Sequence, residues 1–396
     1  MERITQYCTG CRACEQLCPR HSIRMKPDQE GFLTAVIDSE NCVDCGLCAK
    51  RCPQNRDDLQ HETVIDTLAV RLKDEKTLYH SASGGAFAGL ALHAIRQGGI
   101  AFGVRWSDDY TAYHAKAETE NEIWSLLSSK YVQADTMDSF TEVKRLLKNG
   151  RKVLYSGTGC QVAGLKAFLG REYDNLITID LVCHGVPSPL LFRKYIEMLT
   201  GKHGARIEEY NFRDKSGGWG LGYKYKYKYK YKYKYKYGLS YLDPYFKYFV
   251  EGNNYRMCCY SCKYANTHRC GDITIADFWG IEKYHMNFFS TKGVSLMLIN
   301  SEKGKAIWDE NQTDFYVLKS KLEYAIKDNP NLRKPTSLKP NIRAHIYDGI
   351  NTLSPEVYFT QKFPLNVSIL DYLKSIVPMN FKYVLKMLIW KVKRMF

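Results

Sequence analysis

Cysteines are the residues of this sequence best suited to chemistry, and eight of the fourteen lie in two matching runs near the N-terminus. They are Cys8, Cys11, Cys14, Cys18, Cys42, Cys45, Cys48 and Cys52. Each run has the spacing C-x2-C-x2-C-x3-C and ends in a proline, Pro19 or Pro53. The two-residue gaps let the backbone curl so that three thiolates reach three corners of one iron–sulfur cube. The spacing therefore predicts two 4Fe–4S clusters.

The fourth cysteine of each run binds the other cluster in two-cluster ferredoxins. One predicted ligand set is therefore Cys8, Cys11, Cys14 and Cys52. The other predicted set is Cys42, Cys45, Cys48 and Cys18. A pair of zinc sites built from C-x2-C units is the alternative. Two identical four-cysteine runs with trailing prolines favour the clusters over zinc. Between the runs, residues 32–37 (FLTAVI) are predicted to form a strand.

Length and composition favour a folded protein of two or three domains, because 396 residues exceed what one core normally organises. The first ten residues lack the apolar segment of a secretory signal, and no run is long and apolar enough to span a bilayer. The expected location is therefore the cytoplasm, where dense cysteine indicates metal ligation rather than disulfides. The net charge of +15 includes seven lysines of a single tract, so it does not predict nucleic-acid binding.

From about Val64 the pattern changes to alternating strands and helices. The segment SASGG (residues 81–85) precedes a predicted helix, with Ser83 as its N-cap. A glycine-rich loop that opens a helix can bind an anion, although a plain capped helix explains it equally well. Further on, two predicted strands end in GTGCQ (157–161) and CHGVP (183–187). Strand-end loops of this kind are where α/β folds bind ligands.

A second group of cysteines lies at residues 258–270. Cys259 and Cys262 form one C-x2-C pair, which is half of a metal site. The missing thiolates could come from Cys160 and Cys183 at the two strand ends. They could equally come from Cys258 and Cys270 nearby in sequence, and spacing alone leaves both alternatives open.

The order of these motifs resembles the beta-subunit family of coenzyme F420 hydrogenases and dehydrogenases. The resemblance runs from Cys8 to about Trp308. Its motifs are the paired cysteine runs, SASGG, SKYVQ (129–133), GTGCQ, CHGVPS, NFRDK (211–215) and RMCCYSC (256–262) through GDITIADFWG. This sequence departs from the family in having GTGC where GTPC is commoner, and in the extra thiols Cys258 and Cys270.

Members of the resembled family are iron–sulfur flavoproteins that bind FAD in an α/β body. Their clusters relay electrons to or from the flavin, which exchanges a hydride with the substrate. The resemblance favours Cys160, Cys183, Cys259 and Cys262 as ligands of a third 4Fe–4S cluster. Its implied flavin-binding residues are Ser83, Gly84, Gly85, Lys130 and Gln133. Some members act without the deazaflavin coenzyme, so the substrate does not transfer with the resemblance.

The expected architecture is an α+β ferredoxin-like iron–sulfur module followed by an α/β flavin-binding body. Residues 1–60 form the module. Residues 64–155 and 156–330 form the two parts of the body, and residues 331–396 form a basic, apolar tail.

Two segments remain outside this scheme. Residues 223–237 alternate strictly between eight tyrosines and seven lysines, so a strand there would carry all tyrosines on one face. A solvated hairpin strand or loop is favoured over an aromatic, basic surface for nucleic acid or membrane. The stretch 381–396 is apolar and basic; packing on its own domain is favoured, with peripheral membrane contact as the alternative.

The predicted function is that of a cytoplasmic iron–sulfur flavoprotein oxidoreductase. Its expected partners are a redox protein or ferredoxin and a small organic substrate, with no specific nucleic acid. The alternative is a non-catalytic electron-relay subunit of a larger hydrogenase or formate dehydrogenase complex. A binding module that acts through the basic tract is a third hypothesis.

Overall fold

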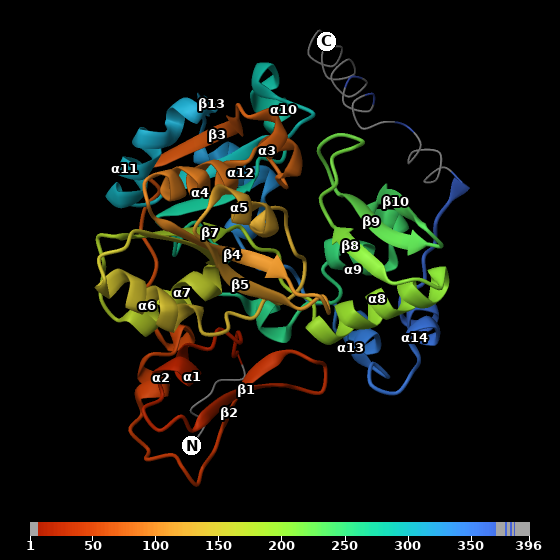
Figure 1. Cartoon of the computed structure of the whole chain (residues 1–396), viewed down its shortest axis with the longest axis horizontal. Helices are drawn as coiled ribbons and strands as arrows, with labels where there is room; N and C mark the ends of the chain where they lie inside the picture. Colours follow the sequence, from red (N-terminus) through yellow and green to blue (C-terminus); the bar gives the residue numbers. More distant parts are fainter. Residues whose placement is uncertain (1–6, 370–376, 378–380, 382–383, 385–396) are drawn as a thin grey trace.

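A computed structural model of the chain describes residues 7–369, 377, 381 and 384. Figure 1 shows the N-terminal module below a large sheet-containing body, with a smaller sheet at one side. The predicted segment 381–396 lies outside the described residues apart from Phe381 and Val384, as do residues 1–6. No helix among the described residues is long and apolar enough to cross a membrane.

The N-terminal module is a two-stranded antiparallel sheet with short helices beside it. Strands β1 (Ile23–Pro27) and β2 (Leu33–Ile37) pair with Ile23 opposite Ile37, which confirms the strand predicted at 32–37. The helices are α1 (Ala13–Leu17), α2 (Leu47–Lys50) and the 3-10 turn η1 (Pro53–Asn55). Ile23, Met25 and Ala35 form a small core against which cysteines of both runs pack.

The body is built on one mixed sheet of eight strands in the order β13-β3-β12-β11-β7-β6-β4-β5. The pairs β4–β6, β6–β7 and β7–β11 are parallel, and the flanking pairs are antiparallel. Strands from before and after residue 155 therefore share one sheet. The bounds are β3 Asp66–Leu72, β4 Ile100–Trp106, β5 Ala112–Ala117, β6 Val153–Thr158, β7 Leu176–Leu181, β11 Ile273–Asp277, β12 Ser295–Ile299 and β13 Phe315–Lys319.

Helices cover both faces of this sheet because its central strands are buried on both sides. In β6, Val153 and Tyr155 face the core under α6 and α7, whereas Leu154 faces the core under α4 and α5. The helices of the body are α3 Glu75–His80, α4 Ala86–Arg96, α5 Glu120–Leu126, α6 Ser139–Lys148, α7 Gly159–Leu169, α10 Ile281–Tyr284, α11 Glu302–Asn311 and α12 Leu322–Asp328. Shorter 3-10 turns are η3 Met257–Ser261, η4 Met286–Phe288, η5 Gln312–Asp314 and η6 Pro330–Leu332.

The smaller sheet has three antiparallel strands in the order β10-β9-β8. Its strands are β8 Ile207–Asn211, β9 Gly222–Tyr229 and β10 Lys232–Leu239. An aromatic core joins its inner end to helices of the same side (Figure 1). These elements are α8 Pro189–His203, η2 Ser240–Leu242, α9 Pro244–Val250, α13 Pro340–Tyr347 and α14 Pro355–Lys362.

The predicted N-cap of the SASGG helix was wrong. Helix α4 begins at Ala86, and its N-cap is Gly85 with φ of 81°. That left-handed conformation suits glycine. The Ser83 hydroxyl instead donates to the carbonyl of Val294 at 2.9 Å, which ties the loop to the sheet.

Candidate functional site

The two N-terminal C-x2-C loops have the same backbone conformation. Gly10 and Arg12, on either side of Cys11, have φ of 73° and 58°. The matching residues of the second run, Asp44 and Gly46, have φ of 56° and 69°. Such left-handed residues curl a loop tightly. In each run, the next cysteine then lies in the first turns of a short helix, α1 or α2.

The thiols of Cys8, Cys11, Cys14 and Cys52 gather at one end of the module. Burial raises the pKa of Cys11 to about 12, and the neighbouring thiols of Cys8 and Cys52 add to this shift. Burial likewise raises the pKa of Cys14, again with a contribution from the other three thiols. Buried neighbouring thiols stay protonated unless a metal compensates their charge. This donor set therefore fits a cluster.

The other four cysteines of the module are half-buried or exposed, and Cys45 is the exposed one. Burial pulls the pKa of Cys18 upward, but hydrogen bonds from the side chain and backbone of Ser22 outweigh it and lower that pKa. The Ser22 N–H lies 3.3 Å from the Cys18 sulfur. N–H donors to sulfur are a feature of iron–sulfur sites. This end of the module is the one open to solvent.

Side chains of the body hold the backbone of the module in place. Gln133 accepts from the Leu33 N–H at 2.9 Å and donates to the Thr9 carbonyl at 3.3 Å. Arg256 donates to the carbonyls of Cys8 and Leu33, both at 2.8 Å. The amide of Gln133, predicted as a flavin contact, is thus engaged with the module, although Gln133 also lines the cavity described next.

Four cysteines from three separate segments line one cavity of about 370 Å³. Cys160 lies in the first turn of α7, Cys183 follows β7, and the other two lie in and just after η3. These cysteines are Cys160, Cys183, Cys259 and Cys262. Burial raises the pKa of Cys183 to about 12, and Cys262 adds to the shift. The cavity therefore collects soft donors that would need a metal to become thiolates.

The two extra thiols lie outside the lining of this cavity. Cys270 is 1% exposed and packs in the core beneath α6 and α7. Cys258 is also buried, beside Cys259. The cavity thus brings together the set favoured by the family resemblance rather than the local set.

Helix α7 connects this cavity to the module. A capping box of Thr158 and Gln161 begins the helix and places Cys160 at the cavity. Gly164, one turn later, faces Cys11: a Cβ on Gly164 would lie 3.0 Å from both Cβ and Sγ of Cys11. Four residues of α-helix span about 6 Å. The two groups of thiols therefore lie on either side of a single helical turn.

The predicted anion loop borders the same cavity. Ser83 and Gly85 line it, together with Lys130. Burial lowers the pKa of Lys130 to about 7. Its ammonium donates to the Leu127 carbonyl at 2.7 Å, at the C-terminal end of α5. The loop and Lys130 therefore lie where the resemblance implied a cofactor.

Gly84 does not line the cavity, because it packs inside the sheet. A Cβ on Gly84 would lie 2.3 Å from the Val70 carbonyl oxygen and 2.3 Å from the Ser295 nitrogen. We expect Gly84→Ala to destabilise the body by about 3 kcal/mol, the scale of an overpacked core. Urea unfolding followed by circular dichroism would measure this. Gly201→Ala, whose Cβ meets nothing within 4 Å, is the control; equal midpoints would contradict the packing role.

Several site residues escaped the sequence analysis, although their motifs NFRDK and ADFWG were noted. Arg213 and Asp277 form a buried ion pair with two contacts of 2.7 Å, and both line the cavity. Burial would raise the pKa of Asp277, but Arg213 and Trp219 hold it below its usual value. Lys215 donates to the Ser83 carbonyl at 2.5 Å and so supports the loop. Only the folded chain brings these segments together.

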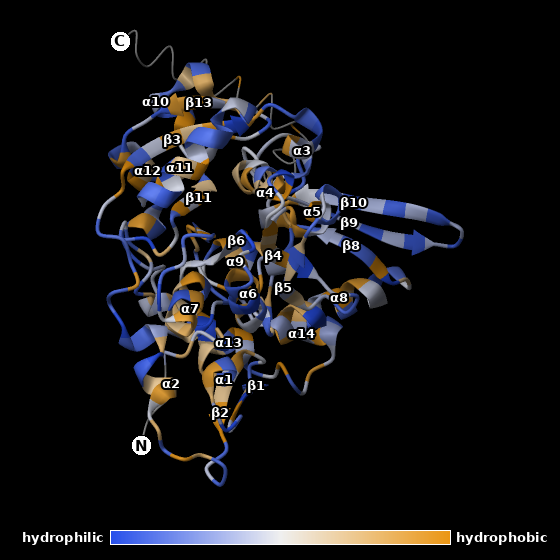
Figure 2. Cartoon of the chain, turned by 60° about the vertical axis from the view of Figure 1, so that its left-hand side comes forward, coloured by the Kyte–Doolittle hydropathy of each residue, from blue (hydrophilic) through white to orange (hydrophobic). Residues whose placement is uncertain are grey.

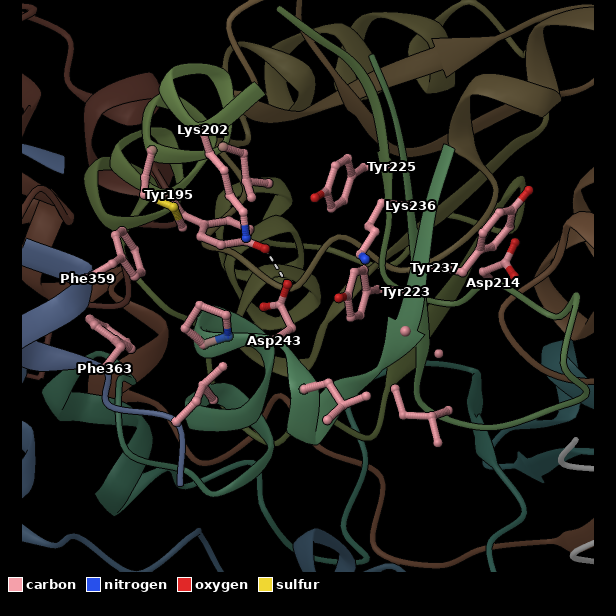
Figure 3. A pocket seen from close by; sticks show the side chains of 18 of the residues that line it. Tyr195, Lys202, Asp214, Tyr223, Tyr225, Lys236, Tyr237, Asp243, Phe359 and Phe363 are labelled. Atoms are coloured by element: carbon pink, nitrogen blue, oxygen red, sulfur yellow. Dashed lines mark hydrogen bonds between the residues drawn. The ribbon is translucent and has the colours of Figure 1, made fainter. Parts of the chain in front are cut away.

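A second, larger hollow of about 1460 Å³ lies at the inner end of the smaller sheet (Figure 3). Aromatic rings of β9 and α14 surround it, and Asp243 lies at its base. Tyr195 and Tyr210 donate to that carboxylate, and burial raises the pKa of Asp243 to about 6. None of the site residues predicted from the sequence lines this hollow, so the smaller cavity is the candidate site.

Two sequence profiles match the chain. Residues 150–323 match the family described by the C terminus of the beta subunit of coenzyme F420 hydrogenase/dehydrogenase, and residues 7–55 match the 4Fe-4S dicluster domain. One chain of the xenon-derivatised F420-reducing NiFe hydrogenase complex from Methanosarcina barkeri is 16% identical, with a TM-score of 0.45. That alignment covers 75% of this chain and 97% of the other.

Curated relatives match the N-terminal module alone. A subunit of the ion-translocating oxidoreductase complex of Methanosarcina acetivorans is 43% identical over 53 residues, which are 13% of this chain and 18% of the relative. The ferredoxin-type protein NapF of Haemophilus influenzae is 33% identical over 52 residues, 13% of this chain and 30% of the relative. The uncharacterized ferredoxin MJ0722 of Methanocaldococcus jannaschii is 40% identical over 70 residues, 18% of this chain and 82% of the relative. The chain thus spans less than a third of the first two relatives.

The module and its matches define an iron–sulfur protein of the ferredoxin type, joined to an α/β body with a large mixed sheet. The chain belongs to the coenzyme F420 hydrogenase/dehydrogenase beta-subunit family and carries an N-terminal 4Fe–4S dicluster domain. This family is associated with oxidoreductases and electron transfer.

Proposed function

We propose that the chain is an iron–sulfur flavoprotein oxidoreductase that acts on a small organic substrate. Electrons pass between the ferredoxin module and a flavin in the cavity through a third 4Fe–4S cluster. One observation carries the proposal: four thiols and a glycine-rich loop line a single cavity, which one turn of α7 separates from Cys11. A location in the cytoplasm fits the reduced thiols.

The third cluster would be held by the four cavity cysteines, Cys160, Cys183, Cys259 and Cys262. Their support is the shared lining and the burial that raises the pKa of Cys183 and of Cys262. Residues from β6–α7, β7 and η3 converge here, so the sheet itself would fix the geometry of the site.

The flavin would lie between this cluster and the loop of Ser83 and Gly85. When bound, a flavin exchanges single electrons with clusters and a hydride with a substrate. The free N–H groups at the start of α4 suit its phosphates. Lys130, with a pKa lowered to about 7, can hold or release a proton at Nζ near neutral pH. The cavity volume of about 370 Å³ is typical of small-molecule sites.

The cluster of Cys18, Cys42, Cys45 and Cys48 would exchange electrons with a partner, because Cys45 is exposed at that end of the module. The partner would be a redox protein or a ferredoxin. The cluster of Cys8, Cys11, Cys14 and Cys52 would then connect it with the cavity through α7.

Anaerobic purification with iron, sulfide and flavin counted per chain tests the proposal. Three cubanes predict about twelve iron atoms, together with one flavin. Turnover of a substrate with a chemical reductant would follow. Clusters without a flavin would instead favour a non-catalytic relay subunit of a larger complex. Zinc in place of iron would contradict both functions.

Cys11→Ser should remove one N-terminal cluster without unfolding the body. The change takes one ligand from a set whose other members lie in the module, so iron should fall by about four atoms per chain. The far-UV circular dichroism should stay that of the wild type. An unchanged iron content would contradict the assignment of Cys11.

A further inference from the structure

The tyrosine–lysine repeat folds as both strands of a hairpin, and its register mixes the two residue types on each face. Each tyrosine of one strand lies opposite a lysine of the other, as in Tyr235 opposite Lys226. Alternation separates tyrosines from lysines within a strand, as expected. In the hairpin, however, each face carries a row of tyrosines beside a row of lysines.

The two faces have different surroundings. The inner end of one face is buried, since Tyr223 and Tyr225 are 6% and 4% exposed in the aromatic core. The outer half of the hairpin extends away from the body (Figure 2). At its tip Tyr231 is 98% exposed, next to Lys230, whose φ of 55° closes the turn. The free end therefore presents tyrosines and lysines on both faces.

The positive charge of this free end is not neutralised by the protein. Among the described residues, Lys226 is the hairpin lysine that forms an ion pair, with Glu209 at 2.7 Å. Several others lie over tyrosine rings instead: Lys234 is 4.0 Å from the centre of Tyr229 and Lys224 is 4.8 Å from that of Tyr235. The unpaired charges call for an anionic partner.

We propose that the free end of this hairpin binds the surface of an anionic lipid bilayer. Tyrosine has an apolar ring and a polar tip, which suits the headgroup region, and lysines are attracted to anionic lipids. A single-stranded nucleic acid fits less well, because it needs free ring faces for stacking and lysines already cover one face of several rings. The inference is independent of the proposed redox function.

Co-sedimentation of the full chain with vesicles tests this inference. Vesicles of phosphatidylcholine mixed with phosphatidylglycerol should retain the protein, and vesicles of phosphatidylcholine alone should not. Each lysine near an anionic surface contributes about fivefold to binding. Changing four tip lysines to glutamine should therefore weaken binding about 100-fold or more. The four are Lys228, Lys230, Lys232 and Lys234.

The matched control removes four exposed lysines elsewhere, Lys148, Lys152, Lys321 and Lys327. It has the same net charge as the tip variant and should bind almost as the wild type does. Since the segment 381–396 is present in every variant, equal binding by both variants would overturn the proposal. So would retention of a labelled single-stranded oligonucleotide without binding to anionic vesicles. Higher salt should release the wild type, because surface charges are screened beyond about 8 Å at physiological ionic strength.

Discussion

Cys259→Ser is expected to lose about four iron atoms per chain and to retain the two N-terminal clusters. Cys259 lines the cavity with three other thiols, whereas the module's cysteines form sets of their own. Loss of one ligand should therefore affect only the proposed third cluster. Iron and sulfide analysis of anaerobically purified protein would measure the loss. Flavin content should fall as well, because the cluster would form one wall of the flavin site.

Cys270→Ser is the matched control for this change. Cys270 is also a buried cysteine of the same segment, but it packs in the core and does not line the cavity. We expect its iron and flavin contents to equal those of the wild type. If Cys270→Ser lost iron while Cys259→Ser retained it, the ligands would be the local set near η3. If both retained iron and flavin, there would be no third cluster.

The features that sequence predicted best are those encoded over short distances. The C-x2-C-x2-C-x3-C runs need only a tight loop and a short helix, and both runs indeed share one backbone conformation. The strand at 33–37 follows from its neighbours in the chain. The family resemblance and the dicluster domain, which depend on such motifs, agree with the matched profiles.

The features that sequence could not predict depend on long-range packing. Nothing in GTGCQVAGL indicates that Gly164 faces Cys11, because that contact exists only after the module docks on α7. The role of Gln133 in holding Leu33 is of the same kind. Gly84 and Gly85 are adjacent, yet one fills a gap in the sheet and the other caps α4. The two glycines could not be told apart by composition.

Tyr264→Ala should raise the reduction potentials of two clusters together. The buried Tyr264 ring lies in the core between the module and the cavity, and its hydroxyl donates to the Pro53 carbonyl at 3.0 Å. Burial raises the pKa of Tyr264, and Cys160, Cys11 and Cys262 are among the neighbours that add to the shift. Removing the ring would admit water beside both sets of thiols. Water favours the more highly charged reduced cluster, so each potential should rise by on the order of 60 mV, a tenfold change for one electron.

Redox titration monitored by electron paramagnetic resonance distinguishes this coupling from simple packing. Tyr264→Phe keeps the ring and should leave both potentials near those of the wild type. Tyr173→Ala removes a tyrosine from the same hydrophobic core, away from the thiols, and should lower stability without moving either potential. Equal potentials in Tyr264→Ala and Tyr173→Ala would mean that Tyr264 only fills space. A joint shift in Tyr264→Ala alone would mean that one side chain keeps water from both clusters, which is the condition for electron transfer across a single turn of α7.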